Sequence, residues 1–139
     1  MPLHLLKMAV GVGDLDQMRR LQKERRTERG GSWFFTRNMP RRHEELLDGG
    51  SIYWVIKGQV RVRQRILGFT PIVGAEGRRF VAVAYDSRLV PTLWLPRRPF
   101  QGWRYLLPED APTDRPADLA ADDDIPLGMA QELRALGLL

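Results

Sequence analysis

The sequence predicts an α+β fold, a small and mostly antiparallel β-barrel flanked by two or three helices. Residues 59–67 alternate apolar and polar side chains with the period of two that marks a half-buried strand, and in residues 79–85 Val81, Val83 and Tyr85 alternate with Phe80, Ala82 and Ala84. Short turns containing glycine separate the segments in the middle of the chain. Because many short strands joined by little connecting chain are typical of small barrels, we predict that the sheet closes on itself.

The composition excludes several classes of protein. The chain has 139 residues, enough for one domain with its own hydrophobic core. It has no cysteine, which excludes disulfide bonds and thiolate metal sites. No apolar run approaches the ~20 residues of a membrane-spanning helix, and the first residues lack the basic start of a signal peptide. We therefore expect a cytoplasmic protein without a membrane partner.

Charge is divided unevenly along the chain. Residues 1–108 contain 20 Lys and Arg against 9 Asp and Glu, whereas residues 109–139 contain 2 against 8. We predict that residues 1–108 form the barrel domain and that residues 109–139 form an acidic extension rich in proline and aspartate. A domain with such an excess of positive charge attracts polyanions, and the acidic extension can compete with them for the same surface.

The N-terminal part of the chain is predicted to form a strand and then a helix. The residues over 3–10 are mostly apolar, as in a buried strand. Asp14 and Gln17 have the spacing of a helix cap, which predicts a helix over about 15–29. Gly30 follows at the position where a helix commonly ends.

A short aromatic strand is expected at 33–35, followed by a second helix. Asn38 is placed to cap that helix over about 39–48. Residues 51–57 are nearly all apolar, as expected for a strand that is buried on both faces.

The C-terminal half is predicted to continue with strands and to end in a helix. Pro91 interrupts the apolar segment 89–95, which indicates an edge strand or a bulge. Residues 96–105 form a basic and aromatic stretch, residues 108–126 read as an extended segment, and a short helix over 127–136 is placed to dock on the body.

Three arginines alternate with apolar residues along the strand predicted at 59–67. Strict alternation places Val60, Val62 and Ile66 on one face and Arg61, Arg63 and Arg65 on the other. A row of like charges is either solvated or neutralised by an anionic partner, and both readings are open at this point. Phosphate fits the second reading, because the planar guanidinium group matches its oxygens in a bidentate pair.

Several segments of the chain resemble a bacterial family of short proteins known only as a domain of unknown function. The matching segments are residues 1–5, 39–42, 45–58 and 98–106, and the resemblance covers nearly the whole chain. This family implies no activity.

A second, more distant resemblance is to the opening of an EVE domain, a branch of the PUA-like barrels. It is carried by Thr36, Arg37, Asn38, Arg41, Arg42, the Gly49-Gly50 turn and the aromatic strand Ile52-Tyr53-Trp54. The chain has Ser51 where EVE domains usually carry an acidic residue. The resemblance implies a PUA-like barrel that binds RNA or a base, in some members a modified base.

Basic and aromatic residues together predict a nucleic-acid-binding module. Arginines hold phosphates while flat rings stack on unpaired bases, a combination typical of proteins that bind single-stranded RNA or DNA. The glycine before Trp103 and the arginine after it leave this ring little apolar context, so we expect it to be exposed. The predicted binding residues are Arg37, Asn38, Arg41, Arg42, Tyr53, Lys57, Arg61, Arg63, Arg65, Arg97, Arg98, Trp103 and Arg104.

No cofactor, metal ion or catalytic residue is predicted from the residues themselves. The two histidines, His4 and His43, have no second ligand at a metal-binding spacing, and no glycine-rich dinucleotide loop is present. The PUA kinship implies one alternative, because some related barrels hydrolyse RNA or small amides with a Lys, a Thr and a Glu. Lys57, Thr36 and Glu45 are the residues of these types, and the alternative function is a small hydrolase acting on RNA or an amide-containing nucleoside.

Overall fold

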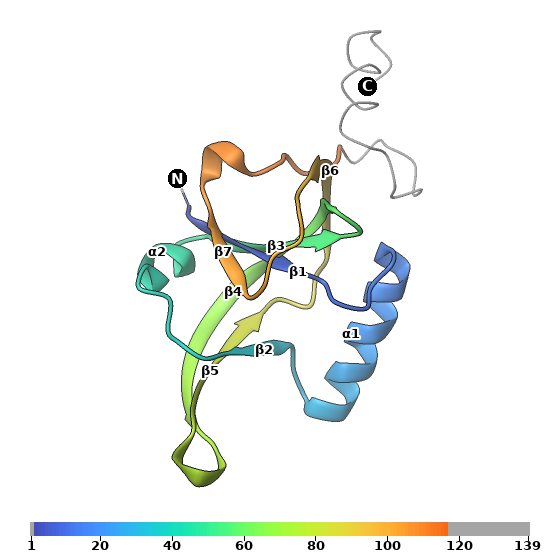
Figure 1. Cartoon of the computed structure of the whole chain (residues 1–139). Helices are drawn as coiled ribbons and strands as arrows, with labels where there is room; N and C mark the ends of the chain where they lie inside the picture. Colours follow the sequence, from blue (N-terminus) through green and yellow to red (C-terminus); the bar gives the residue numbers. More distant parts are fainter. Residues whose placement is uncertain (1, 117–139) are drawn as a thin grey trace, which may run out of the picture.

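A curved sheet of seven strands is the centre of the described chain, residues 2–116 of a computed structural model (Figure 1). The strands are β1 (His4–Met8), β2 (Trp33–Thr36), β3 (Ser51–Ile56), β4 (Gln59–Val73), β5 (Arg79–Tyr85), β6 (Val90–Pro96) and β7 (Trp103–Leu106). The helices are α1 (Leu15–Arg29) and α2 (His43–Leu47), with single 3₁₀ turns at Ala75–Gly77 and Pro108–Asp110. The predicted α+β class is confirmed.

The central strand of the sheet is β4, which pairs with three others. Its first half lies antiparallel to β3 on one edge and to β6 on the other, and its second half pairs with β5. The strand order is β2-β5-β4-β3-β1-β7, with β6 outside this path. The prediction that residues 51–57, 59–67 and 79–85 share one antiparallel sheet is therefore confirmed. The sequence did not indicate that β1 pairs with β3 in parallel.

The predicted closed barrel is wrong. Within residues 2–116, β2 and β7 end the strand order and share no backbone pairing. Side chains instead fill the seam, the gap between β2 on one side and β1 and β7 on the other. Trp103 Nε1 donates to Thr36 Oγ1 at 3.2 Å, and Lys7 Nζ lies 5.1 Å from the centre of the Phe34 ring. Rings between two edges prevent the ~4.8 Å strand spacing that a backbone ladder requires.

Helix α1 has the bounds and the caps that the sequence predicts. Asp14 Oδ1 accepts a hydrogen bond from the Gln17 backbone N–H at 2.7 Å, and Gln17 Oε1 accepts one from the N–H of Gly13 at 2.7 Å. Gly30 ends the helix with a φ of 81°, in the left-handed region that suits glycine.

Helix α2 is shorter than predicted. It begins at His43 instead of residue 39, and Arg42 rather than Asn38 precedes its first turn. A residue that precedes proline avoids the helical region, which keeps Met39 out of a helix. The Pro40 carbonyl accepts a hydrogen bond from the His43 N–H at 3.2 Å, so a separate turn precedes α2.

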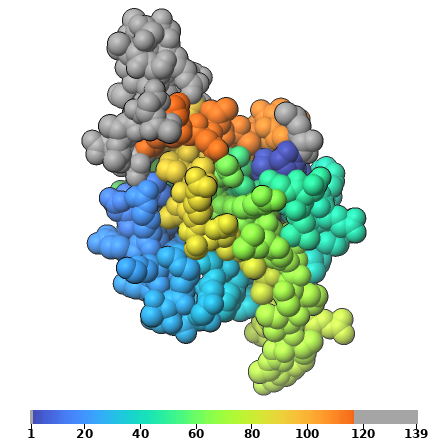
Figure 2. Space-filling view, turned by 180° about the vertical axis from the view of Figure 1, so that it is seen from behind, coloured from blue at the N-terminus to red at the C-terminus, as the bar shows by residue number. Residues whose placement is uncertain are grey.

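Two strand predictions are corrected in the second half of the chain. Strand β4 continues beyond residue 67 to Val73, which pairs with Arg79, and the β4–β5 hairpin projects from the body (Figure 2). Strand β7 was not predicted, although residues 103–106 alternate as a strand does. The predicted helix over 127–136 lies outside the described residues.

The hydrophobic core occupies both faces of the sheet. The larger cluster packs beneath α1 and includes Leu5, Ile52 and Trp54, while the smaller one on the other face includes Leu6 and Tyr53. This alternation along β1 and β3 follows the period of two of a strand. None of the helices in residues 2–116 has the length and apolar character needed to cross a lipid bilayer.

Gly50 offers a test of this packing. A Cβ atom at Gly50 would lie 2.3 Å from the backbone oxygens of both Leu3 and Leu46, whereas one at Gly68 would have nothing within 4 Å. We expect Gly50→Ala to lower the free energy of unfolding by roughly 3 kcal/mol or more, because two backbone segments must move. The control Gly68→Ala should remain within about 1 kcal/mol of the wild type. Urea unfolding measures both, and equal stability of the two variants would contradict the described packing.

Candidate functional site

The three arginines of β4 do not form the continuous row that strict alternation predicts. The register between β3 and β4 shifts at a bulge, so Val60 lies opposite Val55 and Val62 lies opposite Trp54. Val60 and Val62 therefore belong to the clusters on opposite faces of the sheet. Arg61 is the extra residue of the bulge, 9% exposed, with its guanidinium 3.8 Å from the centre of the Trp94 ring. Buried stacking takes Arg61 out of the predicted row.

Arg63 is bound by the first residues of the acidic extension. Its Nε and Nη2 donate to the two carboxylate oxygens of Asp114 at 2.7 and 2.8 Å, and its Nη1 donates to Ser51 Oγ at 3.1 Å. Thr92 of β6 forms an antiparallel bridge with Asp114, which holds this segment against the sheet. Arg65 is exposed. The three arginines thus have three different environments.

Two other groups of the predicted residues do come together. Arg97, Arg98 and Arg104 line a groove of about 650 Å³ with Phe100, and the Arg104 guanidinium lies 5.3 Å from the centre of that ring. We call this the Arg97 groove.

A second groove lies between the residues that follow β2 and the turn end of the projecting β4–β5 hairpin. Arg37 and Asn38 line it together with Arg78, Arg79 and Phe80, which the sequence analysis did not select.

The remaining predicted residues are dispersed. Arg42 pairs with Glu45 and lies 5.7 Å from the centre of the Tyr105 ring, while Arg41 is exposed nearby in the chain. Tyr53 is 5% exposed, and Trp103 is half-buried in the seam instead of exposed as expected.

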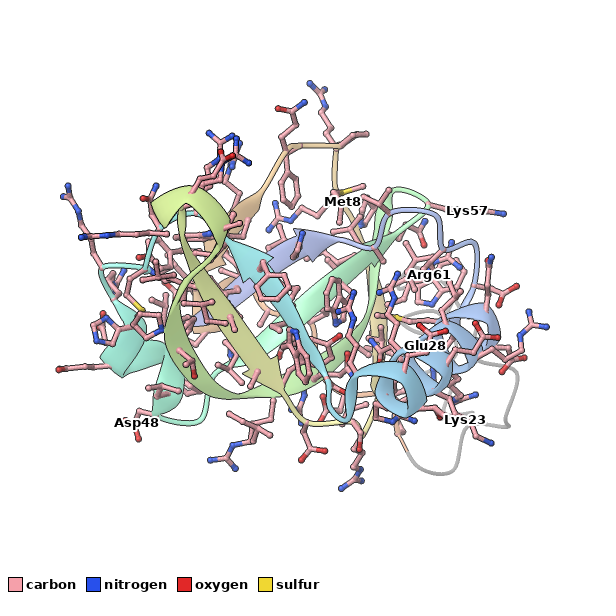
Figure 3. The ribbon with its side chains drawn as sticks, turned by 90° about the horizontal axis from the view of Figure 1, so that it is seen from below. Met8, Lys23, Glu28, Asp48, Lys57 and Arg61 are labelled. Atoms are coloured by element: carbon pink, nitrogen blue, oxygen red, sulfur yellow. The ribbon has the colours of Figure 1, made fainter. Side chains whose placement is uncertain are left out.

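The residues of the alternative hydrolase do not converge. Thr36 accepts the hydrogen bond from Trp103, and Glu45 on α2 is paired with Arg42. Lys57 is exposed in the turn after β3, at the opposite end of the molecule from Asp48, which follows α2 (Figure 3). The described residues also contain no group of three or more His, Asp or Glu that could hold a metal ion.

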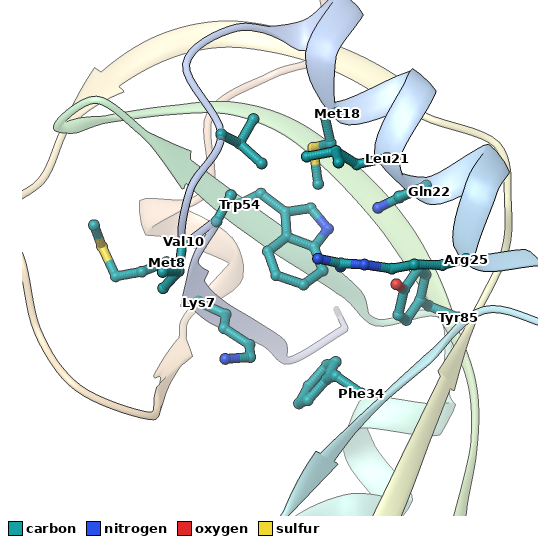
Figure 4. A pocket seen from close by; sticks show the side chains of 12 residues that line it. Lys7, Met8, Val10, Met18, Leu21, Gln22, Arg25, Phe34, Trp54 and Tyr85 are labelled. Carbon is teal, nitrogen blue, oxygen red and sulfur yellow. The ribbon is translucent and has the colours of Figure 1, made fainter.

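A cavity that the sequence analysis did not predict opens at the seam, beneath α1 (Figure 4). Its volume is about 180 Å³. We call it the Trp54 cavity; the residues that line it are Lys7, Met8, Ala9, Val10 and Val12 from β1 and the loop after it, Met18, Leu21, Gln22 and Arg25 from α1, Phe34 from β2, Trp54 from β3, and Tyr85 from β5. None of these twelve residues is acidic.

Three aromatic rings form one wall of the Trp54 cavity. The Trp54 ring centre lies 6.0 Å from that of Phe34 and 5.9 Å from that of Tyr85, both in edge-to-face geometry. Trp54 Nε1 donates to Gln64 Oε1 at 2.9 Å, and the Gln64 amide exchanges hydrogen bonds of 2.7 and 2.9 Å with Gln22. The indole orientation is therefore fixed by buried amides.

Positive charge surrounds the opening of this cavity. Burial lowers the pKa of Lys7, and the Nζ of this residue lies over the Phe34 ring. Arg25 extends across the cavity between Trp54 and Tyr85 (Figure 4). Burial raises the pKa of the Tyr85 hydroxyl, and the nearby charges of Arg25, Arg29 and Arg26 oppose that rise. Of these three arginines of α1, Arg25 is the one that lines the cavity.

The cavity residues escaped sequence reasoning because they also satisfy the pattern of a core. Trp54 and Tyr85 are 7% and 5% exposed. One usable signal was Lys7, a single charge within an otherwise apolar strand. The other residues of the cavity come together only because segments far apart in the chain pack against one another.

The chain belongs to a family of proteins of unknown function, DUF1489, whose sequence pattern matches residues 5–139. The expected membership in a family without assigned function is thereby confirmed. No curated protein and no solved structure matches the chain. The resemblance to EVE and other PUA-like domains is not confirmed by these comparisons.

His4 makes the stability of the fold depend on pH. His4 Nδ1 accepts a hydrogen bond from the Ser51 N–H at 3.0 Å, and burial together with the charge of Arg63 lowers the His4 pKa from 6.5 to about 4. Because the unfolded chain takes up this proton first, stability is lost as the pH falls from 6.5 toward 4. The loss should reach about 2–3 kcal/mol at about pH 4.5, measured by urea unfolding.

The variant His4→Asn isolates this contribution, because its side-chain oxygen can still accept the Ser51 hydrogen bond without titrating. We expect a clearly smaller acid loss in His4→Asn, and the full loss in His43→Asn. An unchanged acid loss in His4→Asn would contradict the assignment.

Proposed function

We propose that this protein binds single-stranded nucleic acid, RNA or DNA, with one unstacked base in the Trp54 cavity and the adjoining phosphates held by arginines of α1. The observation that carries the proposal is the convergence of three aromatic rings and two basic side chains, Lys7 and Arg25, on a cavity without an acidic residue. A ligand that matches this arrangement has a flat ring and a negative charge in close proximity. A nucleotide has both.

Base stacking and phosphate contacts each contribute favourable free energy to such binding. Stacking of a base on an aromatic side chain contributes roughly 1–3 kcal/mol, and each phosphate held by arginine adds a charge-assisted hydrogen bond. Arg25 lines the cavity and Arg29 lies one turn further along α1, so these two arginines can follow a backbone that leaves the cavity.

The Arg97 groove is a separate part of this proposal. Leu6 lines the groove and Lys7 lines the Trp54 cavity, and successive residues of β1 point to opposite faces of the sheet. A single-stranded nucleic acid bound in the cavity would therefore reach Arg97, Arg98 and Arg104 only by passing around the edge of the sheet. We also propose that the protein is related to the PUA-like domains. The cavity at the seam of an incompletely closed sheet supports this relationship.

Arg25 and Arg88 provide a matched test. We expect Arg25→Gln to weaken the binding of a short labelled single strand roughly fivefold to tenfold at low salt, because one phosphate contact is lost. It should also make the dependence of affinity on salt shallower by about 0.7, the value for one phosphate of a single strand. Arg88→Gln removes the same charge from an exposed position away from the cavity lining and should change affinity less than twofold, about the effect of net charge alone.

Fluorescence anisotropy over a range of salt concentrations measures both quantities. Equal effects of the two variants would remove the Trp54 cavity from the proposal. Absence of binding by the wild type at low salt would contradict nucleic-acid binding altogether.

A further inference from the structure

The Trp54 cavity is small for a ligand site. Its volume of about 180 Å³ is below the range of roughly 300–1,000 Å³ that is usual for pockets that take drug-sized molecules. A single six-membered ring with its substituents suits this space better than the fused rings of a purine. If the occupant is a base, as the proposed function requires, its size favours a pyrimidine.

The polar groups of the cavity that remain for a ligand are mainly hydrogen-bond donors. The Trp54 N–H is already donated to Gln64, and the Gln22 amide uses both its oxygen and its nitrogen on Gln64. The Ala9 carbonyl accepts a hydrogen bond from the Val12 N–H at 3.3 Å. Lys7 and Arg25 are left, and both groups can only donate when charged. The hydroxyl of Tyr85 can donate as well.

We propose that the Trp54 cavity selects uracil or thymine over cytosine, an inference that rests on the proposed function. Uracil and thymine carry carbonyl oxygens on both sides of the ring nitrogen N3, so acceptors can meet donors from β1 and from α1. Cytosine has nearly the same size, but an amino group replaces O4, and its N3 accepts a hydrogen bond where that of uracil donates one. Its N–H groups would face the ammonium of Lys7 or the guanidinium of Arg25, which leaves donors opposed to donors.

The strength of this selection depends on the cavity's donors that would lack an acceptor when cytosine is bound. A site built to donate to a carbonyl discriminates strongly against a ligand that lacks the acceptor, because polar groups of the site then stay buried without a partner. We expect oligo(dU) to bind about tenfold more tightly than oligo(dC), within the usual range for one specific base contact. Lys7 is the specificity-determining residue in this scheme, since it lines the cavity from β1 and its Nζ lies 5.1 Å from the centre of the Phe34 ring.

The experiment compares two strands whose bases differ only in the group at position 4 and in the hydrogen on N3. Oligo(dU) and oligo(dC) of equal length and label are titrated with the full chain at low salt. Lys7→Met keeps a long apolar side chain without a donor and should bring the two affinities within about twofold of each other. Lys7→Gln supplies a carbonyl acceptor and should improve oligo(dC) relative to oligo(dU). Circular dichroism melting verifies that each variant is folded.

The outcomes separate this inference from the function on which it rests. Tight and equal binding of both strands by the wild type would overturn the selection of uracil or thymine and leave single-stranded binding in place. A wild-type preference that both Lys7 variants retain would overturn the role of Lys7. Failure of the wild type to bind either strand would overturn the proposed function itself.

Discussion

Gln64 uses every hydrogen-bonding position of its amide in a place that water does not reach. Its nitrogen donates to Gln22 and to the Asp86 carbonyl, and its oxygen accepts from Trp54 and Gln22. Because an unpaired buried amide would cost about 1–3 kcal/mol for each lost partner, these groups hold one another in a single arrangement. The amide joins α1 to β4 and fixes the indole of Trp54, so the shape of the cavity depends on it.

Local features of the sequence predicted most helices and strands. Contacts between segments far apart in the chain determine the closure of the sheet and the residues of the cavity. The bounds of α1 follow from a cap and a terminal glycine, and the antiparallel core of the sheet follows from alternation along β4 and β5. Closure depends on the meeting of β2 with β7, which no local pattern encodes. No glycine or proline stands beside Arg61 to indicate the bulge in the sequence. This bulge alone turns Arg61 away from the predicted row and into the stack with Trp94. The rings of the cavity were not selected as site residues, because an apolar pattern indicates burial and does not indicate a cavity.

The acidic extension contributes to the fold before it leaves the described part of the chain. Asp114 neutralises Arg63, and the backbone around it adds to the edge of β6 through hydrogen bonds from Leu93 to Thr113 and from Arg115 to Pro91. A free strand edge invites pairing with other chains, and this segment covers the one that β6 would present. The acidic run Asp122, Asp123 and Asp124 lies outside the described residues.

The seam between β2 and β7 is held by side chains such as Trp103 and Thr36, not by a backbone ladder. A closed barrel can admit a guest through its wall only by breaking main-chain hydrogen bonds along a strand. Here the contact between the two edges is made by side chains that are half-buried, and no main-chain hydrogen bond joins β2 to β7. Separating β2 from β7 would therefore cost side-chain contacts such as the Trp103–Thr36 hydrogen bond, while every strand pairing of the sheet could stay intact.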